Sequence, residues 1–296
     1  MKTFWYVITS MRPWQWTKNL VLFAGVVFSR QFFDIELVER SLLGFCVFCL
    51  LSGAVYMLND LLDRRHDREH PDKKGRPITT GRLGTPTALT VALVLIGVLL
   101  PLSWLLGRGF FILSLLFVVL NVIYSALLKR AVILDAFSIS FSFLIRATAG
   151  VVVLHPVIPG LELSPWLLIC TLFLSLFLAF CKRRYEICAL RNAIEHRIAL
   201  KEYTPMLLDQ LVGLTSAATL ISYSIYTVWP HTVEKFSTTN LVFTIPFVGF
   251  GLMRYLYLVY SRNEGGDPSG VLLLDRAILV DVLLWSISVI LILWKT

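Results

Sequence analysis

The sequence predicts an all-α fold: a polytopic membrane protein built as a bundle of about nine transmembrane helices. Of its 296 residues, 57% are hydrophobic and only 16% are charged. A soluble globular protein could not bury that much apolar surface. Apolar stretches of about 20 residues recur along the chain, and each is long enough to cross a hydrocarbon core roughly 30 Å thick. These observations together indicate a helical membrane bundle.

Nine segments have the length and apolar character of a membrane span. They lie near 18–33, 38–58, 85–106, 109–128, 132–154, 164–181, 207–229, 240–260 and 273–293. The first is the weakest, because it is short and contains Arg30. The preceding segment, 1–17, has interfacial tryptophans and no small-residue cleavage site. We therefore interpret it as an amphipathic entry segment rather than a signal peptide or a disordered tail.

The distribution of charge predicts the orientation of the bundle. With nine spans, the side of the membrane that holds the N-terminus carries 20 of the 27 Lys and Arg residues. This bias is the positive-inside pattern, so we expect a cytoplasmic N-terminus. The formal charge of +8 is explained in this way, and we expect a lipid bilayer and no nucleic acid as a partner. Most of the charge lies in the connections 59–84, 182–206 and 261–272, and we treat 1–296 as one integral membrane domain.

The strongest candidate for a site is an acidic helix end after the second span. Asp60, Asp63 and Asp67 follow Asn59 at a spacing of i, i+3 and i+7. On one continuous helix, these carboxylates would share a face about 60° wide. Hard oxygen ligands suit Mg²⁺, which commonly binds through a few carboxylates and the phosphates of its substrate. The alternative is a solvated acidic helix end that pairs with neighbouring arginines.

The residues that follow this helix end favour a phosphate-binding site. Lys73, Lys74 and Arg76 lie in a segment stiffened by Pro71 and Pro77. A metal surrounded by cations can hold a diphosphate, with Arg as a bidentate donor and Lys as a point charge. Positive-inside charge alone would explain the basic residues but not the acids beside them.

Further ionisable or polar side chains lie at or near membrane depth, where a charge is costly and suggests function. They are Lys18, Asn19, Tyr124, Lys129, Asp135, Arg146, Arg254 and Asp281. An internal ion pair between Lys129 and Asp135 remains open, as does structural pairing of Arg146, Arg254 and Asp281. A second polar group follows the sixth span and consists of Lys182, Arg183, Arg184, Tyr185 and Glu186, with His196 beyond them. A third group precedes or opens the last span and consists of Arg262, Asp275 and Arg276.

These motifs resemble those of a known superfamily. Nine spans with an N-D-x-x-D-x-x-x-D helix end look like the UbiA-type intramembrane prenyltransferases. Within that superfamily the chain resembles the decaprenyl-phosphate phosphoribosyltransferase branch, through the strings RPWQWTKN (12–19), NDLLDRRHDREHP (59–71), RPI (76–78), LIRATAG (144–150), KRRYE (182–186) and GGDP…DR (265–276). The resemblance covers nearly the whole chain and implies a UbiA-like fold in a bacterial inner (plasma) membrane, with a cytoplasmic active site.

The resemblance also implies a reaction. The expected donor is phosphoribosyl diphosphate, the acceptor a polyprenyl phosphate of decaprenyl type, and the cofactor Mg²⁺. The second D-x-x-x-D motif of the prenyltransferases is missing, and Tyr185 and Glu186 stand there with flanking bases. That difference favours the phosphoribosyl donor over the alternative, an isoprenoid diphosphate whose prenyl group passes to an aromatic or other acceptor. A transporter or lipid-binding protein with purely topogenic loops is the remaining alternative.

The expected roles can be assigned residue by residue. Asp60, Asp63 and Asp67 would hold the metal, and with Lys18 and Glu186 they form the expected catalytic set. The expected substrate-binding set is Asn59, Lys73, Arg76, Tyr124, Lys129, Asp135, Arg146, Lys182, Arg183, Arg262, Asp275 and Arg276. Among these residues, Lys18, Lys73, Arg76, Lys129 and Lys182 would clamp phosphates, and Glu186 or Asp275 would contact ribose hydroxyls or a second metal.

Overall fold

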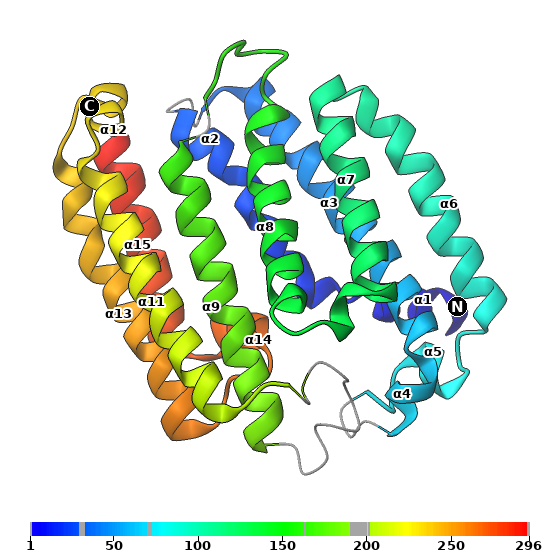
Figure 1. Cartoon of the computed structure of the whole chain (residues 1–296). Helices are drawn as coiled ribbons and strands as arrows, with labels where there is room; N and C mark the ends of the chain where they lie inside the picture. The colour runs from blue at the N-terminus through cyan, green and yellow to red at the C-terminus, as the bar shows by residue number, and fades with distance from the viewer. Residues whose placement is uncertain are drawn as a thin grey trace. The chain divides into compact units, whose positions relative to one another are not determined.

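The computed structural model describes residues 2–29, 33–69, 73–162, 164–189, 200 and 202–294. Within these ranges every regular element is a helix, and eight helices are long and apolar enough to cross a membrane (Figure 1). They are α3 (Ile35–Leu62), α6 (Thr85–Trp104), α7 (Arg108–Ala126), α8 (Leu134–Val152), α9 (Pro165–Ala189), α11 (Pro205–Val228), the run Asn240–Arg262 and α15 (Arg276–Trp294). They correspond to the last eight predicted spans.

The first predicted span, 18–33, has a different structure from the others. It falls on a 3₁₀ helix, η1 (Pro13–Phe23), and a short α-helix, α2 (Ala24–Ser29), while residues 30–32 lie outside the described part. Pro13 suits the first position of η1, because its missing N–H would have no partner there. Neither helix alone has the length of a span.

The chain forms two compact units. Within the described part, unit 1 holds the residues up to Ser138 and Ile145–Leu161, and unit 2 holds Ile139–Leu144 and the residues from Glu162 onward. Helix α8 contributes residues to both. The expectation of a single domain therefore stays a prediction.

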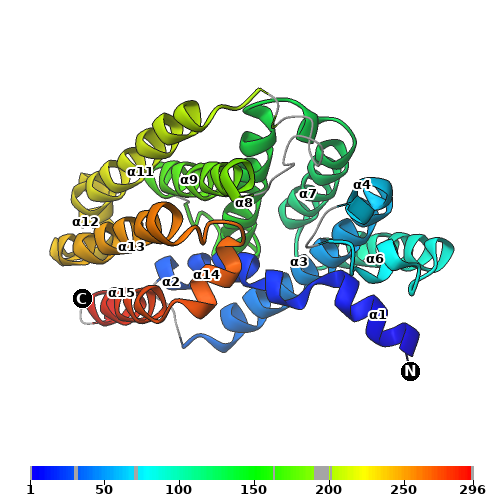
Figure 2. The ribbon, with the colours of Figure 1, turned by 90° about the horizontal axis from the view of Figure 1, so that it is seen from below.

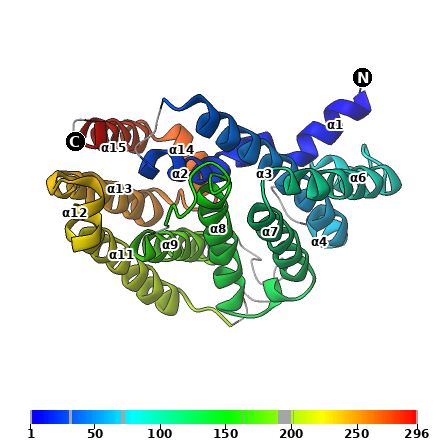
Figure 3. The ribbon, with the colours of Figure 1, turned by 90° about the horizontal axis from the view of Figure 1, so that it is seen from above.

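The core of unit 1 forms around α3. Helices α6 and α7 pack against α3 and against each other, as Figure 3 shows. Phe48 of α3 lies 5.6 Å from the ring of Phe110 and 5.1 Å from that of Phe117. A second apolar cluster joins α3 to α1 (Lys2–Met11) and to α5 (Pro77–Thr80) through Met11, Met57 and Ile78. Both α1 and α5 are thereby fixed beside the acidic end of α3.

Two glycines let the backbone of α8 touch those of α2 and of the preceding helix η1. A Cβ on Gly25 would lie 2.7 Å from the carbonyl carbon of Gly150, and a Cβ on Gly150 would lie 2.6 Å from the Cα of Leu22. Both distances are below any normal contact, so neither position accepts a side chain. Small residues at such crossings are the usual way for membrane helices to pack closely.

Unit 2 is built from α9, α11, α13 (Ile245–Tyr257) and α15, with α11 packed along α9 and α13 along α15 (Figure 2). The short helices η4 (Asn240–Thr244) and η5 (Leu258–Arg262) flank α13, and η5 is wound as a π-helix. Helices α12 (Pro230–Phe236) and α14 (Pro268–Leu274) complete the unit. Buried Tyr223 shares a hydrogen bond with Thr244 and accepts one from the indole N–H of Trp285, which fixes three segments to one another.

Candidate functional site

The predicted acidic helix end is present, with a small break at its centre. Helix α3 ends at Leu62, and α4 (Arg64–Glu69) begins after Asp63, whose backbone angles are φ −90° and ψ 1°. Helical hydrogen bonding nevertheless continues through the break, since Asp63 donates its N–H to Asn59 and Asp67 donates its own to Asp63, both at 2.9 Å. The side chains of Asp60 and Asp67 are only 2% and 4% exposed, whereas that of Asp63 is 23% exposed.

Basic side chains surround these carboxylates. Arg76, at the N-terminus of α5, places one nitrogen, Nη1, 3.0 Å from Asp60 and 2.6 Å from Asp67. Lys73 lies 3.9 Å from Asp67, and Lys129, on η2 (Leu128–Arg130), pairs with Asp63. Six of the predicted site residues are thus brought together within unit 1. The competing expectation for Lys129 was an ion pair with Asp135, and the ion pair observed is with Asp63.

Arg12 is a member of this cluster that the sequence reasoning did not select. Its guanidinium pairs with Asp60 and stacks over the ring of Tyr56 at 4.9 Å. Its backbone has φ 54°, a left-handed conformation that a non-glycine residue adopts only when its surroundings hold it there. The only sequence feature that pointed to Arg12 is its place in the motif RPWQWTKN, directly before Pro13. The sequence analysis interpreted residues 1–17 only as an amphipathic segment at the membrane interface.

The cluster has the donor chemistry of a metal–phosphate site. Asp60 and Asp67 both contact Arg76 Nη1, so two buried carboxylates already share one cationic atom. Hard carboxylate oxygens are the ligands that Mg²⁺ prefers. Among the described residues, no three acidic, histidine or cysteine side chains converge on a ready-made metal cage. The acids are instead neutralised by basic side chains, which are themselves suited to phosphate.

Deeper in unit 1, Arg146 is buried in α8. Its Nε donates to the side-chain oxygen of Asn19 at 2.7 Å, and its guanidinium lies 4.6 Å from the centre of the Phe117 ring. This is the structural pairing that the sequence left open for Arg146, and the predicted substrate role is untested. Of the other predicted residues of unit 1, Asp135 is buried, and Lys18, Asn59 and Tyr124 are half-buried.

In unit 2, the predicted residues after the sixth span continue α9 as helix. Arg183 is buried and pairs with Glu186 at 2.7 Å, one helical turn away, and Lys182 is half-buried. Gly266 lies directly on Tyr185, because a Cβ there would come within 2.5 Å of the ring. The two strings KRRYE and GGDP are thus in contact. Glu195 and His196 lie outside the described residues.

The acid before the last span has a structural partner. Asp275 pairs with Arg254 at 2.8 Å and accepts the backbone N–H of Ile278 at 2.9 Å, so it also caps the start of α15. The hydrogen bond from Arg254 lowers the pKa of Asp275 below its ordinary value. Arg262 is exposed and donates to the hydroxyl of Tyr257, and Arg276 is exposed. These contacts explain Asp275 without a substrate, and its predicted binding role is untested.

A family model described as the UbiA prenyltransferase family matches residues 20–292. The chain belongs to this family. It is therefore an enzyme, a multi-pass membrane transferase, as the sequence predicted.

Individual relatives agree with this family. The chain is 31% identical to a decaprenyl-phosphate phosphoribosyltransferase of Corynebacterium glutamicum, over 96% of this chain and 85% of the relative. It is 30% identical to an enzyme of the same name from Mycobacterium tuberculosis, over 96% of this chain and 92% of the relative. Among solved structures, a UbiA homolog from Archaeoglobus fulgidus bound to GPP and Mg²⁺ matches with a TM-score of 0.72 and 16% identity, over 97% and 99% of the two chains. The last match supports the predicted fold.

Proposed function

We propose that this enzyme transfers the 5-phosphoribosyl group from phosphoribosyl diphosphate to a polyprenyl phosphate of decaprenyl type and releases diphosphate. The observation that carries the proposal is the cluster in unit 1, where Asp60, Asp63 and Asp67 are matched by Arg12, Lys73, Arg76 and Lys129. A group of interleaved acids and bases can receive a metal and a diphosphate together. The names of the relatives support the choice of donor and acceptor.

The proposed reaction is a displacement at the anomeric carbon of the ribose. An oxygen of the lipid phosphate forms a bond to that carbon as the bond to the diphosphate oxygen breaks. The lipid phosphate is already anionic, so no side chain has to remove a proton from it. When bound, Mg²⁺ would offset the negative charge that develops on the leaving diphosphate.

The side chains of the cluster would exchange partners when the substrate binds. Asp60 and Asp67 would turn from Arg76 toward the metal, and Asp63 would complete the set of ligands. Arg12, Arg76 and Lys129, released from the carboxylates, would then contact phosphate oxygens, with Arg as the bidentate donor. The exchange leaves every charged group paired before and after binding, which avoids the cost of an unpaired buried charge. The roles proposed for Lys18 and Glu186, and for the rest of the predicted binding set, rest on the sequence resemblance.

A transfer assay tests the proposal. Purified enzyme with Mg²⁺, labelled phosphoribosyl diphosphate and decaprenyl phosphate should yield ribosylated lipid and an equal amount of diphosphate. The same enzyme should not transfer a prenyl group from geranyl diphosphate to an aromatic acid. Transfer in the second reaction only would assign the chain to the prenyl-transferring members of the family and overturn the proposed donor.

We also propose that the enzyme lies in the bacterial inner membrane with its N-terminus and the acidic end of α3 facing the cytoplasm. The excess of Lys and Arg on that side supports this orientation. A reporter enzyme that is active only outside the cytoplasm, fused after Trp294, should be active, and the same reporter fused within 73–84 should be inactive. The reverse pattern would overturn the orientation.

A further inference from the structure

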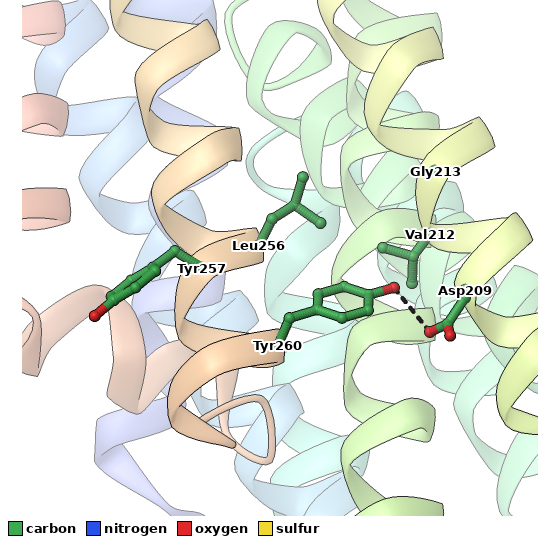
Figure 4. Close-up of a pocket in the computed structure, with 6 residues that line it drawn as sticks. All are labelled: Asp209, Val212, Gly213, Leu256, Tyr257 and Tyr260. Carbon is green, nitrogen blue, oxygen red and sulfur yellow. Dashed lines mark hydrogen bonds between the residues drawn. The ribbon is translucent and has the colours of Figure 1, made fainter.

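Unit 2 has an open groove that the proposed reaction does not use. It lies between α11 and the end of α13 with η5, has a volume of about 420 Å³, and is lined by Asp209, Val212, Gly213, Leu256, Tyr257 and Tyr260 (Figure 4). Its walls are almost entirely apolar, and a Cβ on Gly213 would meet no atom within 4 Å. The groove is therefore open along α11 at Gly213.

One end of the groove is polar: Asp209 and Tyr260 line it, and Arg184 contacts both of them. Asp209 Oδ1 accepts a hydrogen bond from Arg184 Nε at 2.6 Å and another from the hydroxyl of Tyr260 at 2.8 Å. The Arg184 guanidinium also stacks on the Tyr260 ring at 3.9 Å (Figure 4 shows this ring directed toward Asp209). Three side chains from three helices thus hold one another in fixed positions.

This polar end keeps hydrogen-bonding capacity beyond these contacts. Among the hydrogen bonds of the described residues, none uses the two terminal nitrogens of Arg184 or the second carboxylate oxygen of Asp209. The side chains of Asp209 and Arg184 are 43% and 16% exposed, so neither is fully buried. A cationic donor and an anionic acceptor therefore stand side by side, each with sites left for a ligand.

The position of this end fits the headgroup layer of a bilayer. Asp209 lies in the first turns of the span Pro205–Val228, whereas Arg184 and Tyr260 lie near the ends of the spans that finish at Cys188 and Arg262. Val212, Gly213 and Leu256 lie further into their spans. Polar and aromatic residues at the ends of spans meet the headgroups, and apolar positions beyond them meet acyl chains.

We propose that this groove binds one phosphatidylethanolamine-type lipid. Its phosphate would accept hydrogen bonds from Arg184, its primary ammonium would donate to Asp209, and an acyl chain would lie along Gly213 and Leu256. A choline headgroup has no N–H to donate to the carboxylate. A purely anionic headgroup would meet the carboxylate of Asp209 with like charge. The π-helical winding of η5, a distortion often found at functional sites, lies in the wall of the groove that carries Tyr260.

Lipid retention measured by native mass spectrometry tests the proposal without any turnover. Purified protein would be mixed in detergent with dioleoyl-phosphatidylethanolamine, with the choline lipid, or with the glycerol lipid. We expect about tenfold tighter binding of the ethanolamine lipid, the effect of one hydrogen bond to a charged group. Equal binding of all three lipids, or tighter binding of the glycerol lipid, would overturn the proposal.

Two variants locate the site. Gly213→Leu should fill the groove and remove the tight binding, whereas Gly97→Leu, at an equally open glycine in α6 of unit 1, should leave it intact. Asp209→Asn should bind ethanolamine and choline lipids equally while keeping an acceptor for Arg184. Thermal unfolding in the same detergent verifies that each variant is folded. Tight ethanolamine binding that survives in Gly213→Leu would place the lipid elsewhere and reject this site.

Discussion

The predicted site acids Asp60 and Asp67 of unit 1 are paired differently from Glu186 and Asp275 of unit 2. In unit 2, Asp275 has Arg254 as its basic partner and also caps a helix, and Glu186 pairs with Arg183 one turn away. In unit 1, Asp60 contacts two arginines, and one of them also contacts Asp67. A one-to-one ion pair that also caps a helix stabilises the fold. Carboxylates and arginines that share partners can exchange them when a ligand binds, without leaving a buried charge unpaired.

The largest expected effect comes from Asp60→Asn. The substitution keeps the size of the side chain but removes a charge that the proposed metal needs, so activity should fall on the order of 10²–10³-fold. Binding of Mg²⁺ with diphosphate, followed by calorimetry, should weaken in parallel. The control is Glu36→Gln, an exposed acid at the other end of the same helix, which should behave as wild type. Unchanged activity in Asp60→Asn would remove this cluster from the reaction.

The next effect tests Arg12, which the structure adds to the site. Arg12→Ala should raise the KM for phosphoribosyl diphosphate about 10- to 100-fold, because the proposed hydrogen bond from Arg12 to a phosphate oxygen of the substrate is lost. Arg12→Lys should raise the KM less than Arg12→Ala does, because the lysine keeps a positive charge but not the bidentate geometry of arginine.

Arg40→Ala, which removes the partner of Glu36 on the same helix, is the matched control and should leave the KM unchanged. A lower kcat for Arg12→Ala with an unchanged KM would instead indicate that Arg12 only holds Asp60 in place.

A third prediction tests how tightly unit 1 is packed. Gly150→Ala should destabilise the protein by about 1–3 kcal/mol, because its methyl group would overlap the backbone of Leu22. Thermal unfolding in detergent should show a lower Tm. Gly97→Ala, where a methyl group meets nothing, should leave the Tm unchanged or raise it slightly. Equal Tm values for the two variants would show that the contact between η1 and α8 tolerates a side chain.

The smallest effect concerns the pair Arg254–Asp275 in unit 2. Because the pKa of Asp275 is lowered in the folded protein, the ionised form stabilises the fold above the unfolded value of about 3.9. That contribution is lost as the pH falls through this value toward the lower folded pKa. It should be below about 1 kcal/mol, since Arg254 is partly exposed.

Unfolding measured at several pH values compares Asp275→Asn with wild type. The two should differ near pH 7 and converge in acid, whereas Asp275→Ala should lose about 1 kcal/mol more because the cap of α15 is gone. Parallel curves for Asp275→Asn and wild type would show that the pair contributes nothing.

The sequence predicted most of the fold because hydropathy alone defines a span. The last eight spans match helices of the structure within a few residues, except that α9 extends from the predicted end at 181 to Ala189. That extension is formed by the charged string from Lys182 to Glu186, which leaves the apolar pattern but continues the helix. Hydropathy therefore locates where a chain leaves the membrane and not where its helix stops.

The site could be predicted only in part. The spacing of Asp60, Asp63 and Asp67 is local, so the sequence displays it directly. Two partners of these acids are not local: Arg12 is 48 residues from Asp60, and Lys129 is 66 residues from Asp63. Such pairs depend on how the helices pack, and one sequence contains no record of that packing. The pairings of Asp67 with Lys73 and Arg76 join residues close in the sequence, and the sequence analysis accordingly placed these bases beside the acids.

The winding of η1 sets how far the beginning of the chain can reach. A 3₁₀ helix rises about 2.0 Å per residue, so the 11 residues of η1 extend about 22 Å, some 5 Å more than the same residues would as an α-helix. Laid end to end with the 6 residues of α2, they approach the roughly 30 Å of a hydrocarbon core. Because Arg12 directly precedes η1, rewinding this segment as an α-helix would shorten the span between Arg12 and α2 by about the same 5 Å. The stretched winding of η1 thus acts as a spacer between Arg12, which pairs with Asp60, and the contact of α2 with α8.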